Sequence, residues 1–155
     1  MRVYLAGNIT EVTIEGARNW RQYATKRLTE KGLVVLDPIP ETCDKSKEKR
    51  LSFTSNLGYD IYIGKYIVDK DLAMIDAATV LLVEMTNSTI AYRGTICEMV
   101  EAKNKGKIVV VWSEWAGSHP WLANYATIIL PTLDDCITFI TQNMCTEDQL
   151  GLIKD

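Results

Sequence analysis

The sequence feature that most constrains the fold is a strand–loop–helix–strand pattern in the second half of the chain. An apolar run over residues 79–85 is followed by a polar loop over 86–93 and then by a helical pattern over 94–102. Gly106 ends that helix, and a second apolar run covers 107–112. Two short apolar runs joined by one helix predict a parallel β-α-β unit.

The start of this helix is expected to face the carboxyl ends of the strands. We predict that Gly94 lets the backbone turn tightly, and that the first helical turn, from Thr95, leaves unpaired N–H groups toward the loop. Glu98 lies one turn further along, where its carboxylate can reach the edge at which open α/β sheets bind ligands. A helical glutamate is ordinarily a surface residue, so a functional role depends on polar groups that other segments bring to the same edge.

The rest of the chain repeats the same alternation of strands and helices. We expect further strands at 2–6, 33–36 and 127–130, and further helices at 14–31, at 59–77 and from Pro131 onward. Five strands alternating with helices predict an α/β three-layer sandwich with a five-stranded parallel sheet. The expected flavodoxin/Rossmann-like order, 2-1-3-4-5, places the end of the first strand beside the end of the third.

Two long connections do not fit this alternation. Residues 41–58 form a charged loop for which we expect a lid or a solvated run, and its basic residues are candidates for contacting a phosphate. These residues are Lys45, Lys47, Lys49 and Arg50. Residues 113–125 are rich in aromatic side chains and predict a packed loop with a short helix. No repeat or linker divides the chain, so we expect a single domain over 1–155.

Composition excludes several classes of function. A net charge of −3 argues against binding the backbone of a nucleic-acid polymer, although a local pocket for one phosphate fits it. The four cysteines form no C-x-x-C pair and no secretory signal is apparent, so we expect reduced thiols and a cytoplasmic protein. With one histidine, His119, no metal site is expected. No apolar run approaches the roughly 20 residues that span a bilayer.

Four segments bring candidate site residues to the same edge of the predicted sheet. Gly7 and Asn8 end the first strand, and the glycine would let a ligand approach the backbone. Asp71 lies on the helix before the third strand, where pairing with Lys70 is its simpler interpretation. Tyr4 is expected to be buried on a central strand, so its hydroxyl needs a partner, and Glu98 is the candidate. The last segment contributes crevice residues by position: Tyr92, Arg93, Gly94 and Thr95.

This arrangement resembles the nucleoside 2-deoxyribosyltransferase family, including related N-glycosidases of deoxynucleoside monophosphates. The resemblance covers about residues 2–112 and is carried by three motifs in order. They are Tyr4-Leu5-Ala6-Gly7, Asp71-Leu72-x-x-Ile75, and Gly94-Thr95-x-x-Glu98 with Ala102 and Gly106-Lys107. It implies that Glu98 is the nucleophile, that Asp71 transfers a proton or orients the base, and that the Tyr4 hydroxyl positions Glu98.

Independent chemical reasoning agrees with these roles. Cleavage of an N-glycosidic bond builds positive charge on the anomeric carbon, which a carboxylate can trap covalently while a second group protonates the departing base. The partners would then be a nucleoside or nucleotide and a free nucleobase, with no cofactor, and we expect a homo-oligomer. The family usually carries an acidic or serine residue just before the glycine-led turn. Here Tyr92 and Arg93 stand there, which leaves room for an anionic substrate.

Two other functions fit parts of the pattern. A binding module on the same fold could sequester or sense a nucleotide without turnover, and the Tyr92-Arg93 departure favours it, whereas Glu98 together with Asp71 favours the enzyme. A flavodoxin-like domain fits less well, because the loop after the first strand lacks the Ser/Thr-rich phosphate cradle that flavin mononucleotide needs. Transfer of the sugar to another base and transfer to water stay open at this stage.

Overall fold

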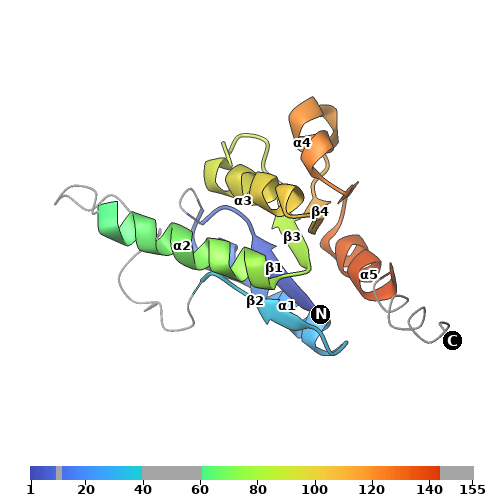
Figure 1. Ribbon diagram of the computed structural model, residues 1–155. Helices are drawn as coiled ribbons and strands as arrows, with labels where there is room; N and C mark the ends of the chain where they lie inside the picture. Colours follow the sequence, from blue (N-terminus) through green and yellow to red (C-terminus); the bar gives the residue numbers. More distant parts are fainter. Residues whose placement is uncertain (10–11, 40–60, 144–155) are drawn as a thin grey trace, which may run out of the picture.

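The computed structural model describes residues 1–9, 12–39 and 61–143 as an α/β sandwich (Figure 1). The strands are β1 (Arg2–Ala6), β2 (Val34–Leu36), β3 (Val80–Glu84), β4 (Ile108–Trp112) and β5 (Ile128–Leu130). The helices are α1 (Ile14–Thr29), α2 (Ile61–Ala77), α3 (Arg93–Asn104), the 3₁₀ turn η1 (Ala116–Ser118), α4 (Pro120–Tyr125) and α5 (Leu133–Asn143). The basic loop expected over 41–58 and the tail from Cys145 lie outside the described residues.

The sheet has the predicted topology. All five strands are parallel and lie in the order β2-β1-β3-β4-β5. Tyr4 pairs with Leu36 on one side and with Leu81 on the other, so the ends of β1 and β3 are neighbours. The fold class and the strand order expected from the sequence are therefore confirmed.

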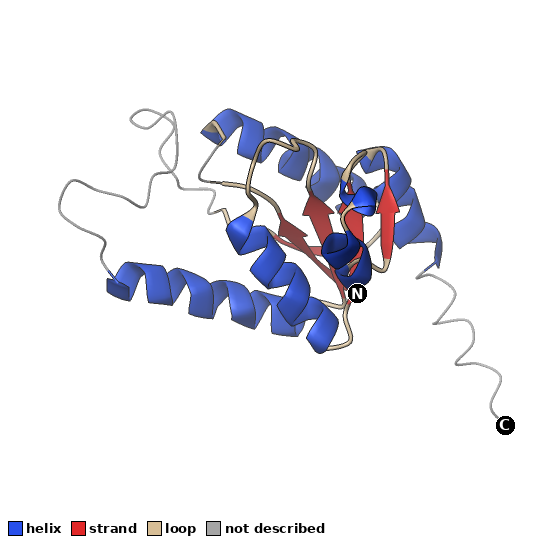
Figure 2. Ribbon diagram, turned by 90° about the horizontal axis from the view of Figure 1, so that it is seen from above, coloured by secondary structure: helices blue, strands red, loops and turns tan. Residues whose placement is uncertain are grey.

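Helices cover both faces of the sheet (Figure 2), and alternate strand residues build a separate core on each face. Val3 and Leu5 point to the face covered by α1 and α5, where they join a core that contains Leu28 and Ile140. Tyr4 and the residues in phase with it point to the face covered by α2, α3 and α4. This alternation follows from the two-residue period of a strand, and it places the Tyr4 ring on the α2–α3 side.

Local signals explain where several helices begin and end. Gly32 and Gly106 adopt left-handed backbone conformations, with φ of 77° and 70°, just after α1 and α3. Thr132 caps α5, because its Oγ1 accepts a hydrogen bond of 3.1 Å from the Asp135 amide. The arrangement differs from a standard capping box, since the Asp135 carboxylate accepts a hydrogen bond of 2.6 Å from the Thr132 hydroxyl and not from the Thr132 amide.

Candidate active site

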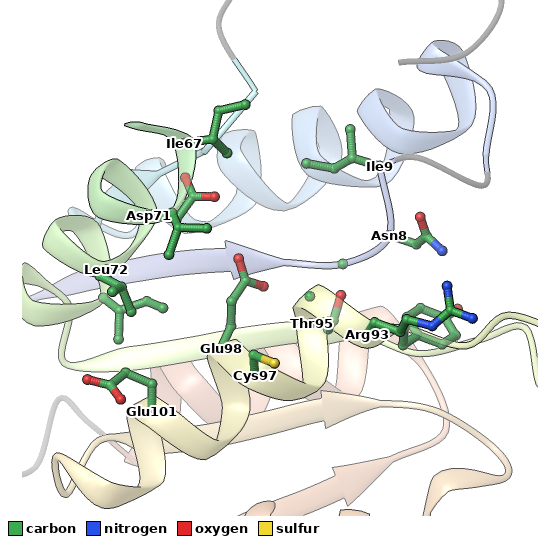
Figure 3. A pocket seen from close by; sticks show the side chains of 15 residues that line it. Asn8, Ile9, Ile67, Asp71, Leu72, Arg93, Thr95, Cys97, Glu98 and Glu101 are labelled. Atoms are coloured by element: carbon green, nitrogen blue, oxygen red, sulfur yellow. The ribbon is translucent and has the colours of Figure 1, made fainter. Parts of the chain in front are cut away.

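A cavity of about 560 Å³ opens at the carboxyl end of β1, between α2 and α3 (Figure 3). Its size is typical of small-molecule sites. One wall is apolar and includes Ile67, Leu72 and Ile75 from α2. The facing wall comes from the first turns of α3, which contribute Thr95 and Glu98. All the site residues predicted from the sequence line this cavity except Tyr4, which contacts Glu98 from the strand below.

Glu98 is held by the hydroxyl predicted for it. The Tyr4 hydroxyl donates a hydrogen bond of 2.7 Å to Glu98 Oε1, across 94 positions of sequence. Tyr4 is fully buried on β1, and its burial together with the nearby negative charge of Glu98 raises the pKa of its phenol. Tyr4 therefore stays protonated as a fixed donor to Glu98 Oε1.

The electrostatic environment makes Glu98 a carboxylate that titrates near neutrality. Burial raises its pKa to about 7, and the charge of Asp71 adds to this effect. The hydrogen bond from Tyr4 and the positive charge of Arg21 act in the opposite direction. When such a buried carboxylate is ionised, few water molecules solvate it. Weak solvation makes a carboxylate a better nucleophile or base.

Asp71 faces the same cavity from α2. Its side chain is only 18% exposed, and its Oδ1 lies 3.8 Å from the Lys70 ammonium, beyond hydrogen-bond distance. That Oδ1 accepts no hydrogen bond from the described residues, while Lys70 instead donates to the Pro38 carbonyl at 2.9 Å. Burial raises the pKa of Asp71, with Lys70 acting against the rise. An unpaired, partly desolvated carboxyl group in a cavity wall can exchange a proton with a bound ligand.

The end of β1 forms the floor of the cavity at Gly7 and Asn8. A Cβ at Gly7 would lie 2.9 Å from Trp20 Cζ2 and 3.2 Å from Glu84 Cβ, so only glycine fits between these two side chains. Asn8 follows it, lines the cavity and is 8% exposed. The close packing around Gly7 therefore fixes the backbone from which Asn8 projects.

The residue that turns the chain into α3 is Tyr92 and not Gly94, so the expectation for Gly94 is wrong. Tyr92 adopts φ = 48°, whereas Gly94 lies inside the first turn of α3, which begins at Arg93. The Tyr92 hydroxyl donates to Glu84 Oε1 at 3.0 Å and accepts from the Asn87 amide at 3.1 Å. These two bonds hold the left-handed conformation, which is rare for a bulky residue.

Gly94 has a different effect on the site. A Cβ built at Gly94 would meet no atom within 4 Å, so this glycine keeps the cavity open beside the start of α3. Arg93 lies on the same turn, and Figure 3 shows its side chain at the end of the cavity where Asn8 also lies. Glu101 and Leu72 mark the opposite end. Thr95 is buried between them and lines the cavity.

Two buried charged residues under the site were not identified from the sequence. Glu84 ends β3, is 8% exposed and accepts hydrogen bonds from the Thr86 amide at 2.8 Å and from Tyr92. Its position directly after a buried strand was an available signal. Arg21 on α1 is completely buried and donates to the Gly7 carbonyl at 3.0 Å. Its helical spacing from Ala17, Ala24 and Leu28 places it on the buried face of α1, and this was an available signal.

The arrangement supports carboxylate chemistry on a small molecule. Two carboxyl groups, Glu98 and Asp71, face one cavity from different helices, and one of them is held by a buried tyrosine. Within the described residues, no group of three His, Cys, Asp or Glu side chains is arranged to hold a metal ion. In the same part of the chain, no helix combines the length and the apolar character needed to cross a membrane.

Comparison with known proteins places this site in a family. The family model described as "Nucleoside 2-deoxyribosyltransferase like" matches residues 1–115, which include every residue of the cavity named above. Comparison with curated proteins gave no match.

Solved structures share the fold at low sequence identity. A 2-deoxyribosyltransferase from Leishmania mexicana superposes with a TM-score of 0.62 at 16% identity, over 92% of this chain and 97% of that one. A 2-deoxyribosyltransferase from Bacillus psychrosaccharolyticus gives 0.59 at 16% identity, over 87% and 89%. A CMP N-glycosidase from Clostridium botulinum gives 0.55 at 18% identity, over 90% and 98%. These likenesses establish the fold.

Proposed function

The chain belongs to the nucleoside 2-deoxyribosyltransferase-like family, and on this premise we propose that it cleaves the N-glycosidic bond of a 2′-deoxynucleoside or deoxynucleotide through a covalent intermediate on Glu98. The observation that carries the proposal is the Tyr4–Glu98 hydrogen bond of 2.7 Å, beneath a cavity that Asp71 enters from the opposite helix. A pure binding site has no need for a desolvated carboxylate held in one orientation.

In the first half-reaction, Glu98 attacks the anomeric carbon on the face opposite the base. The bond from that carbon to the base nitrogen breaks, and an ester forms between the sugar and Glu98. The departing base takes a proton from Asp71, whose carboxyl group faces the same cavity from α2. Tyr4 holds Glu98 Oε1 during this step, so the attacking oxygen is Oε2.

In the second half-reaction, a ring nitrogen of another base or a water molecule attacks the same carbon. The ester bond breaks, Glu98 regains its carboxylate, and the proton lost by the attacking group passes to Asp71. The enzyme is restored, and the product is a new nucleoside or the free sugar. Glycosidic mechanisms of this type need both carboxyl groups in opposite protonation states at the start.

The cavity also suggests how the substrate lies. The base would rest on the apolar wall near Leu72 and beside Asp71, with the sugar over Glu98. The 5′ end of the sugar would then point toward Asn8 and Arg93, where a phosphate could meet the guanidinium. This orientation makes a deoxynucleoside monophosphate the preferred substrate class.

The decisive experiment combines Glu98→Gln with covalent trapping. Glutamine keeps the size and hydrogen-bonding ability but removes the charge, so release of base should fall by at least about 1,000-fold while ligand binding persists. A 2-fluoro-2-deoxyribosyl substrate slows both half-reactions, and mass spectrometry of a digest should find the sugar on the peptide that contains Glu98.

Cys97→Ser provides the matched control, because Cys97 is the neighbouring exposed residue of the same cavity wall and has no part in the mechanism. It should be trapped as the wild type is. Near-full activity of Glu98→Gln, or a label on another peptide, would exclude the covalent mechanism. A wild-type protein that binds deoxynucleotides tightly and never releases base would instead be a sequestering or sensing module.

A further inference from the structure

Arg21 is an unusual residue for the inside of a protein. It lies on α1 with 0% of its surface exposed, and its guanidinium stacks over the Trp20 ring at 4.5 Å from the centroid. Burial of a charged group is unfavourable unless partners replace the lost water, and it lowers the pKa of this guanidinium. A buried arginine beneath a polar cavity therefore calls for a functional explanation.

Its hydrogen bonds tie α1 to the floor of the cavity. One terminal nitrogen donates to the Ala17 carbonyl at 2.6 Å, within α1, and the other donates to the Gly7 carbonyl at 3.0 Å. Gly7 lies between Trp20 and Glu84, with no room for a side chain. The guanidinium thus fixes the backbone at the end of β1 from below, while packing fixes it from the sides.

Acidic groups from several elements surround this cation. Asp37, which follows β2, lies 3.6 Å from the Arg21 Nε, and that nitrogen has no hydrogen-bond partner among the described residues. Glu84 at the end of β3 and Glu98 on α3 also interact with the Arg21 charge, as does the Tyr4 hydroxyl on β1. Arg21 in turn opposes the effect of burial on Glu98, whereas Asp71 on α2 reinforces it.

We propose that Arg21 is a positioning residue of the active site, which anchors the Gly7–Asn8 floor through the Gly7 carbonyl and supplies a buried positive charge that favours the ionised form of Glu98. This inference rests on the function proposed above, but it adds a residue on the far side of the floor that never touches the substrate. The two effects are separable, because one depends on the shape of the guanidinium and the other on its charge.

Two substitutions of Arg21 separate the anchoring effect from the charge effect. Arg21→Gln removes the charge, so the Glu98 carboxyl should titrate at higher pH, and the acidic limb of the kcat/KM profile should move to higher pH with it. Arg21→Lys keeps the charge but not the fork that reaches both Ala17 and Gly7. It should leave the Glu98 titration near that of the wild type and lower kcat/KM by about 100-fold through misplacement of the floor.

Titration of Glu98 is measured by ¹³C NMR of the glutamate carboxyl carbons in the unliganded protein, with the Glu98 signal assigned by its absence in Glu98→Gln. This measurement needs no turnover, so it tests the charge effect even if the protein releases no base. Arg27→Gln is the matched control: it lies on the same helix, with 42% of its side chain exposed, and pairs with Asp134 on the surface. It should change neither the titration nor the activity.

The outcomes decide between the proposal and a purely structural role. A folded Arg21→Gln protein with an unshifted Glu98 titration overturns the charge effect, and Arg21→Lys with wild-type kcat/KM overturns the anchoring effect. If Arg21→Gln does not fold, Arg21→Lys still has to combine a normal titration with reduced kcat/KM. Absence of base release in the wild type, together with a shifted titration in Arg21→Gln, would reject the proposed function and the anchoring effect but retain the charge effect on Glu98.

Discussion

The two faces of the sheet are built from alternate residues of the same strands, yet they differ in content. The core beneath α1 and α5 is mainly apolar, with Val3, Leu5 and Leu28 fully buried, although α1 also buries Arg21. The face beneath α2 and α3 buries two tyrosine rings, those of Tyr4 and Tyr92, with the same completeness. Both faces are well packed, but only the second leads into the cavity.

The difference between the two faces separates residues that mainly stabilise the fold from residues that line the cavity. Aliphatic burial contributes roughly 25 cal/mol for each Å² of apolar surface removed from water, and on that face Arg21 is the buried charged group, among the described residues, that opposes it. On the other face, each buried hydroxyl or carboxyl needs a partner, and burial of Glu98 opposes its ionisation. Mutations on the two faces should therefore produce different kinds of defect.

The largest expected effect on the cavity side, after that of Glu98 itself, is for Asp71→Asn. Loss of the proton donor should slow release of a natural base by about 100-fold to 10,000-fold. An N7-methylated purine deoxynucleoside carries its own positive charge, so its cleavage should be slowed far less. Steady-state assays of both substrates with the same variant measure this difference. Equal slowing would assign Asp71 a binding or structural role.

On the aliphatic face, Leu28→Ala should act on stability alone. Removing a fully buried leucine side chain from a packed core should lower the free energy of unfolding by about 2–5 kcal/mol. Activity per folded molecule should be unchanged below the unfolding transition, because Leu28 lies across the sheet from the cavity. Urea unfolding and kcat/KM on the same preparation test this, and a selective loss of kcat/KM would contradict the separation.

Removal of the Glu98 charge should raise the free energy of unfolding, whereas the change at Leu28 should lower it. Its pKa is about 7 in the folded protein and lower when unfolded, so the favourable contribution is present at low pH and is lost as pH rises through about 7. Glu98→Gln does not ionise and should be more stable than the wild type above pH 7, by about 1–2 kcal/mol. Urea unfolding at about pH 5 and about pH 8 should show a much larger difference at the higher pH.

The smallest expected effect concerns Arg93. If its guanidinium contacts a 5′-phosphate, Arg93→Ala should reduce the preference for a deoxynucleoside monophosphate over the free nucleoside by about tenfold. The preference in the wild type should weaken as salt is raised. Lys103→Ala, which removes a charge from the last turn of the same helix, is the control. If the wild type shows no preference for the monophosphate over the nucleoside, Arg93 does not form a phosphate subsite.

Much of this molecule follows from local sequence patterns. The parallel sheet, its order and the meeting of Tyr4 with Glu98 were predictable, because strand and helix periodicities fix the elements and topology rules bring strand ends together. The contact between Tyr4 and Glu98 is confirmed, whereas the catalytic roles of both residues and of Asp71 stay predictions.

Other features depend on contacts that no local pattern records. Gly94 looked like the turn residue because glycine tolerates positive φ, but Tyr92 adopts that conformation two residues earlier, where its hydroxyl donates a hydrogen bond to the Glu84 carboxylate. Arg21 shares a helix face with Ala17, Ala24 and Leu28 in the sequence, but that spacing does not show what could compensate a buried charge there. Its burial is decided by a carbonyl at the end of β1 and a carboxylate after β2. The sequence by itself determined the elements and their order, and tertiary structure alone decided which charges lie beneath the site, because desolvation depends on segments that meet only in the folded chain.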